Sequence, residues 1–287
     1  MPTFNTPEPI AVTLSIVAGN MHINATDRTD TVVEIHPNDP SVEVDVRAAE
    51  QARVDYSNGQ LNIRAPRPRA FGLIGRAAAI DVTVALPAGS RVTSDASAAA
   101  LDATGRLGEC RIKTSAGEIH LEDAGDVHLT TGAGEISVGR VAGDAEVSTG
   151  SGRVRLRHVE GLTVIKNSNG ESWIGTAGGD LRVHGSNGSI IVEHAHGGVT
   201  ATTAMGDVRI GEVVRGAVSL KTAMGGLDVG VRTGTAAWLD AHTRFGRVHN
   251  RLQVAAAPAE QEDTVEVRAR TAYGDIVIHH TTEEAVA

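Results

Sequence analysis

The chain has 287 residues, a formal net charge of −9 and only seven aromatic residues, namely three Phe, two Tyr and two Trp. An acidic balance with scattered arginines excludes the concentrated basic face that nucleic-acid binding requires. A single cysteine, Cys110, excludes an intramolecular disulfide framework and a cysteine-rich zinc site.

The N-terminal segment has no basic region ahead of its apolar residues, and its apolar residues alternate with polar ones. No stretch of the chain approaches the roughly 18 consecutive apolar residues of a membrane span. We therefore expect a cytoplasmic protein without a transmembrane segment, and surface exposure stays open as an alternative.

Residues 1–95 show the alternation of apolar and polar residues that is typical of β-strands. Asn58 and Gly59, between two such stretches, form a strong hairpin signal. No helix of convincing length is expected anywhere in the chain. The predicted strands are 10–17, 21–26, 31–36, 41–47, 52–57, 60–65 and 80–86.

The rest of the chain is dominated by glycines at a nearly constant spacing, which indicates a solenoid of stacked coils. Successive members are 17, 18, 18, 18, 18, 19, 21 and 28 residues apart, and each closes a short turn. These predicted turn residues are Gly117, Gly134, Gly152, Gly170, Gly188, Gly206, Gly225, Gly246 and Gly274.

Other positions keep a fixed offset from these glycines. The residues two and four places after each glycine are mostly apolar, which predicts inward-facing columns along the stack. The residue three places before is usually threonine, as in Thr114, Thr131 and Thr203. A hydroxyl at this corner is expected to bond turn amides that the strand ladder leaves unpaired.

These patterns predict an all-β fold, a single-stranded β-helix (β-solenoid) with about 18 residues per coil and an N-terminal antiparallel β cap. We expect the cap to occupy 1–95, the solenoid repeats 96–280 and a tail 281–287, with a polar loop at 251–263. A cap is physically required because the end of a solenoid exposes unpaired backbone and core residues.

The repeats could in principle carry three kinds of chemistry. A calcium-binding roll needs a regular aspartate column, and here arginines such as Arg153 interrupt that column. His194 and His196, and the pair 279–280, are expected to be solvated rather than metal ligands. Glu118 and Glu135 could stack one coil apart, which keeps a polysaccharide-acting enzyme open as an unfavoured alternative. We expect no catalytic residue, no metal and no cofactor.

The position just before the turn glycine changes character along the chain. It is small or polar in the first coils and large and apolar in the last four, at Met205, Met224, Phe245 and Tyr273. Stacking would place these side chains in one apolar ridge, either a docking strip or a strip covered by the loop 251–263 or the tail. Trp173 and Ile191 form a second, smaller candidate patch.

The run LPAGSRVTSDAS at 86–97, the run GRLGECRIKTSAGEI at 105–119 and the repeated TxxGxI/V units resemble the bacterial β-strand-repeat family named "putative adhesin". The sequence is similar to the leaderless actinobacterial-type branch over most of its length. The resemblance implies a β-helix of unknown function and no established catalytic residues.

The expected function is therefore that of a non-enzymatic scaffold or protein-interaction module, which binds a protein partner or self-assembles. Two alternatives remain: a surface adhesin or carbohydrate-binding protein, and the polysaccharide-acting enzyme.

Overall fold

The computed structural model describes residues 2–66, 77–252 and 263–281. The chain divides into two compact units, Met1–Ala142 and Gly143–Ala287, which are described in turn. Both are built from short strands wound into a β-solenoid, so the predicted fold class is confirmed.

The N-terminal unit has eleven strands and one helix among its described residues. They are β1 (Thr3–Asn5), β2 (Ala11–Thr26), β3 (Asp30–Pro37), α1 (Glu43–Gln51), β4 (Arg53–Ser57), β5 (Gln60–Arg64), β6 (Ala79–Pro87), β7 (Arg91–Arg106), β8 (Cys110–Ala116), β9 (Ile119–Ala124), β10 (Val127–Ala133) and β11 (Ile136–Val141).

The strands of this unit run along two faces. The long strand β2 lies parallel to β5 and β6 over its two halves and parallel to β7 along most of its length. β8 and β10 continue one face in parallel, and β9 and β11 continue the other. The outermost strand pairs of both faces are antiparallel. On one face β4 pairs with β5, and on the other β3 pairs with β6 and with β1. This is the predicted antiparallel cap.

One prediction in this region is wrong. The segment 41–47 was expected to be a strand, and the chain was expected to lack a convincing helix, but α1 occupies Glu43–Gln51. Its alternating valines do not face a core, because Val44 is exposed while Ala48 and Asp45 are buried. Asp45 Oδ1 accepts a hydrogen bond of 2.9 Å from the backbone N–H of Ala79, at the start of β6. The helix thus supplies an acceptor to the end of a strand.

The C-terminal unit contains only strands within its described residues. They are β12 (Ala145–Ser151), β13 (Val154–Val159), β14 (Thr163–Asn169), β15 (Ser172–Ala177), β16 (Leu181–Asn187), β17 (Ile190–Ala195), β18 (Val199–Thr202), β19 (Val208–Val213), β20 (Gly216–Met224), β21 (Leu227–Val231), β22 (Ala236–Phe245), β23 (Val248–Asn250), β24 (Thr264–Tyr273) and β25 (Ile276–His280). Each coil supplies one strand to either face.

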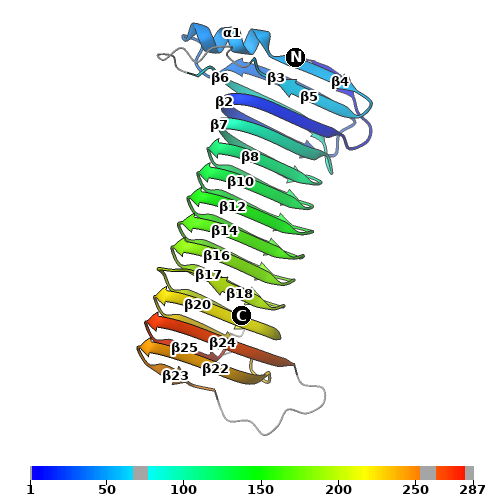
Figure 1. Ribbon diagram of the computed structural model, residues 1–287. Helices are drawn as coiled ribbons and strands as arrows, with labels where there is room; N and C mark the ends of the chain where they lie inside the picture. Colours follow the sequence, from blue (N-terminus) through cyan, green and yellow to red (C-terminus); the bar gives the residue numbers. More distant parts are fainter. Residues whose placement is uncertain (1, 67–76, 253–262, 282–287) are drawn as a thin grey trace, which may run out of the picture. The chain divides into compact units, whose positions relative to one another are not determined.

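The last two coils are not stacked in sequence order. β24 pairs in parallel with β20 on one side and with β22 on the other. On the second face β25 lies between β21 and β23 in the same way. The final coil of the chain is therefore inserted between two earlier coils, and β22 lies beyond β24 (Figure 1). We call β24 and β25 the inserted coil, and β22 and β23 the end coil.

The glycine turns allow neighbouring coils to approach closely. Eight of the nine turn glycines have φ between 138° and 150°, a region that residues with a side chain rarely adopt, and Gly246 is the exception. A Cβ on Gly188 would lie 2.0 Å from the carbonyl oxygen of Gly170 in the coil before it. The turns thus require glycine both for φ and for space.

Most of the corner threonines are buried, and their hydroxyls mostly donate to carbonyl oxygens instead of accepting from turn amides as expected, although Thr114 Oγ1 also accepts a bond of 3.5 Å from the N–H of Ala99. Thr131 Oγ1 donates to the carbonyl oxygens of Gly117 and Ala133, both at 3.2 Å. Thr222 Oγ1 donates in the same way to the carbonyls of Gly206 and Met224. Because turn amides already bond carbonyls of neighbouring coils, such as Gly206 N to Met224 O, the carbonyls are the groups that need a donor.

Candidate interaction surface

The apolar residues before the turn glycines lie together in the C-terminal unit. Met205, Met224, Phe245 and Tyr273 are exposed by 50%, 46%, 53% and 55%. We call these four side chains the ridge. Large apolar side chains are normally buried, so four neighbours that are half exposed form an unusual surface.

Backbone pairing fixes the order of the ridge. Met205 pairs with Met224, Met224 with Tyr273, and Tyr273 with Phe245. Tyr273 therefore lies between Met224 and Phe245, because it belongs to the inserted coil. Its ring stacks on that of Phe245, with centroids 4.8 Å apart and planes 13° from parallel. The guanidinium of Arg244 lies 5.3 Å from the Phe245 ring centre. The ridge thus has a flexible thioether end and a rigid aromatic end.

The sequence also allows the loop 251–263 or the tail to cover the ridge. Residues 253–262 and 282–287 lie outside the described residues, so this alternative stays a prediction.

The second predicted patch, Trp173 and Ile191, consists of directly paired residues on β15 and β17. Both side chains are half-buried rather than exposed. The indole N–H of Trp173 donates to Glu193 Oε1 at 3.1 Å, and the Arg155 guanidinium lies 5.6 Å from the ring centre. These polar neighbours use part of the surface that a partner would contact, so this patch is a weaker candidate than the ridge.

The end coil forms a third exposed surface, which the sequence did not indicate. No residue of β22 is buried, although its inward column corresponds to buried residues of β24. Leu239 pairs with the buried Val267, and Val248, which pairs with Ile276, is 44% exposed. Trp238 is 58% exposed, and together with Ala236 and Ala237 it borders a pocket of about 590 Å³.

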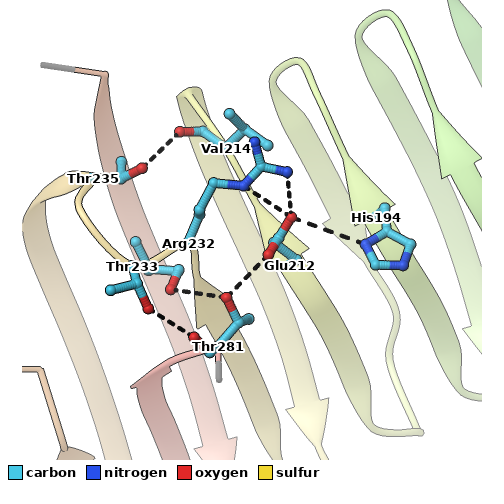
Figure 2. A network of polar contacts seen from close by, with 8 residues as sticks. His194, Glu212, Val214, Arg232, Thr233, Thr235 and Thr281 are labelled. Atoms are coloured by element: carbon cyan, nitrogen blue, oxygen red, sulfur yellow. Dashed lines mark hydrogen bonds and ion pairs between the residues drawn. The ribbon is translucent and has the colours of Figure 1, made fainter. Parts of the chain in front are cut away.

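A network of hydrogen bonds and ion pairs links Thr281, the residue that follows the inserted coil, to Glu212 and Arg232. Glu212, the residue before the last of β19, accepts hydrogen bonds from Arg232 at 2.6 and 3.1 Å and from Thr281 Oγ1 at 3.0 Å. His194 Nδ1 lies 4.0 Å from the same carboxylate, and Thr233 Oγ1 donates to the Thr281 carbonyl at 2.8 Å. Figure 2 shows Glu212 at the centre of this group. The network joins β17, β19 and the residues that follow β21 and β25.

Burial of Glu212 disfavours its charge, but the hydrogen bonds from Arg232 and Thr281, with the charges of Arg232 and His194, lower its pKa overall. A carboxyl group with a lowered pKa in the folded state stabilises that state above its unfolded pKa. The stabilisation is lost as the pH falls through the folded pKa.

Glu212→Gln is therefore expected to destabilise the C-terminal unit by about 1–2 kcal/mol at pH 7, because two charge-assisted hydrogen bonds are weakened. The difference from wild type should shrink as the pH falls below the ordinary glutamate pKa of about 4.3, and it should be gone once the pH is below the lowered pKa of the folded state. Urea unfolding at several pH values measures both effects. Glu118→Gln, at an exposed position, is the control and should change little, and a difference for Glu212→Gln that persists at low pH would contradict the electrostatic explanation.

The other titratable residues that the sequence pointed to do not form a metal site. Within residues 2–66, 77–252 and 263–281, no three His, Cys, Asp or Glu side chains lie close enough to hold a metal ion. His279 contacts Asp228 at 3.0 Å, and Glu118 and Glu135 lie on adjacent turns of the N-terminal unit. Cys110 is fully buried, and burial raises the pKa of its thiol to about 12. A thiol with this pKa stays protonated and unreactive at neutral pH.

A scan against protein families matches residues 18–286 to the family described as Toastrack DUF4097. The chain belongs to the Toastrack DUF4097 family. Among the described residues of this Toastrack protein, the one helix is too short and polar to cross a bilayer. A search of curated proteins finds no match.

Several solved structures are similar to this Toastrack chain, among them proteins described as putative adhesins. The protein from Parabacteroides merdae is 15% identical with a TM-score of 0.49, over 79% of this chain and 94% of that one. The protein from Bacteroides fragilis is 12% identical with a TM-score of 0.42, over 79% and 95% of the two chains.

Proposed function

We propose that this Toastrack protein is a non-enzymatic interaction module of adhesin type, which binds a protein partner through the ridge. The observation that carries the proposal is the contiguity of Met205, Met224, Tyr273 and Phe245, each about half exposed and each on a neighbouring coil. Contiguous apolar surface and aromatic side chains are enriched where proteins bind one another.

The composition of the ridge favours an apolar partner segment. Methionine side chains adapt their shape and make favourable contacts with aromatic rings. The stacked rings of Phe245 and Tyr273 offer a broad, preorganised surface that loses little conformational freedom on binding. A rigid solenoid holds these side chains at the spacing of its coils, which suits a scaffold.

The double variant Met205→Ser and Met224→Ser is expected to reduce partner capture at least about tenfold, since truncation of hot-spot residues typically costs 2 kcal/mol or more (about 30-fold). The measurement is an affinity capture from lysate of the source cells with quantitative mass spectrometry. Leu162→Ser is the matched control, because Leu162 is also an exposed large apolar residue, 40% exposed, but lies outside the ridge.

Proteins that are lost with the ridge variant and kept with the control would support the proposal. An unchanged set of captured proteins, with both variants folded by circular dichroism, would contradict it.

A further inference from the structure

The end coil leaves one strand edge unpaired among the described strands, since β22 pairs with β24 alone. The N–H of Ala236 donates to Asp263, on the β24 side. Successive residues of a strand direct their N–H and C=O groups to opposite sides. The N–H groups of Ala237, Leu239 and Ala241 therefore face away from β24, along an open edge.

Such an edge is a template for another strand, and natural proteins usually cover it. Here it is long, with ten residues in β22, and it has no proline. Its inward column, which includes Leu239 and Ala241, is only half-buried where the paired residues of β24 are buried. A strand added at this edge would satisfy the backbone groups and cover the apolar column together.

We propose that the open edge of β22 pairs antiparallel with β22 of a second copy of this chain, which forms a twofold-symmetric dimer. The proposal goes beyond the ridge function and depends on residues other than the four ridge side chains: Trp238, Asp240, Ala241, His242 and Arg244.

The outward side chains of β22 are complementary to themselves in one register. With Ala241 on the twofold axis, Asp240 lies opposite His242 of the other copy, and Trp238 lies opposite Arg244. The first pair sets a carboxylate against an imidazole, and the second sets a guanidinium against an indole ring. A shift of the axis by one residue to Asp240 would place two carboxylates opposite each other, and a shift to His242 would shorten the paired segment.

The outermost strands of the N-terminal unit do not offer the same edge, and β23 of the end coil has only three residues. In the N-terminal unit the outermost strands are antiparallel and short, with three residues in β1 and five in β4. Helix α1 contacts β3 and β6 there, and buried Asp45 accepts the N–H of Ala79. Because pairing of β22 with itself uses the edge completely, the assembly closes as a dimer and does not grow into a filament.

Light scattering after size-exclusion chromatography of the full chain tests the assembly. We expect twice the monomer mass of 29.8 kDa at micromolar concentration. Ala241→Pro removes an N–H that faces the open edge and leaves the ladder to β24 intact, so it should shift the protein to the monomer mass. Ala241→Ser keeps the N–H and should remain dimeric.

A crosslinking experiment tests the register independently of the proline. A mixture of Asp240→Cys and His242→Cys proteins should form a disulfide between the two variants under mild oxidation, because directly opposite residues lie about 4.5–5.5 Å apart. Each variant alone should crosslink far less, since residues displaced along the strand exceed the reach of a disulfide. Buried Cys110 does not interfere.

Three results would overturn the proposal. One is a monomer at all concentrations up to about 100 µM, with the β22 amides exchanging freely. The second is a monomer whose β22 amides are protected, which would show that another part of the same chain covers the edge. The third is a dimer that survives Ala241→Pro with that variant folded, or that crosslinks equally well without the mixture.

Discussion

Val267→Asp is expected to destabilise the C-terminal unit by about 4 kcal/mol or more, because it places an unpaired carboxylate in a dry column. Val267 is fully buried in the inserted coil, where it pairs with Val218 on one side and Leu239 on the other. Both neighbours are apolar, so nothing in this column can solvate a charge.

The matched variant is Leu239→Asp, in the same inward column one coil away. Leu239 is only half-buried, since β22 lies at the end of the stack. Its carboxylate can reach water, so the expected loss is about 1 kcal/mol. Urea unfolding followed by circular dichroism compares the two variants directly.

The comparison tests the order of the coils. If the coils were stacked in sequence order, β24 would lie at the end and β22 inside, so Leu239→Asp would be the more damaging change. A larger loss for Leu239→Asp than for Val267→Asp would therefore contradict the insertion of the last coil.

Gly188→Ala is expected to destabilise the protein by about 3 kcal/mol or more. Two effects act together at this turn. The backbone has φ of 140°, and a Cβ would lie 2.0 Å from the Gly170 carbonyl oxygen and 2.6 Å from its carbon. Relief of that overlap requires two coils to separate, which weakens the hydrogen bonds on either side.

Gly185→Ala, three residues earlier, is the matched control. There the nearest atom to a new Cβ is Thr203 Oγ1 at 3.4 Å, an ordinary contact, and φ is not in the left-handed region. Because alanine restricts the unfolded chain, this change should be neutral or stabilising by up to about 1 kcal/mol. Thermal unfolding of the two variants gives the comparison, and equal losses would show that close approach of the coils is not what requires glycine at 188.

The repeat could be predicted from the sequence because each coil carries the same short constraints. The glycine spacing and the alternating apolar residues depend on local geometry, namely the turn and the strand period of two. Residues at equal positions in successive coils become neighbours, which is why Trp173 and Ile191 pair directly, as do Met205 and Met224.

The helix α1 could not be predicted by the same pattern. Val42, Val44 and Val46 alternate with polar residues as in a strand, yet the segment is helical from Glu43. Its place beside β3 and β6 and the bond from Ala79 to Asp45 are long-range effects, and these override the local preference of valine for strands.

The insertion of the last coil was not visible in the sequence either. The inward residues of β22 and β24 are of the same kind, with Ala237 beside Val265 and Leu239 beside Val267, so either strand suits either place. The longer spacing before Gly274 leaves room for a longer connection between β23 and β24. The spacing does not specify that β24 pairs between β20 and β22. The open edge of β22 is a consequence of this insertion, so it could not be predicted from the sequence either.

The insertion has a consequence for biosynthesis. A ribosome delivers the end coil before the inserted coil, although the place next to β20 belongs to β24, which is made later than β22. The chain cannot reach its final arrangement until about residue 280 has left the exit tunnel. Until then the strand edges of β22 and β23 that later pair with β24 and β25 are either unpaired or paired with β20 and β21. Completion of this unit therefore waits until the inserted coil has been synthesised and has left the tunnel.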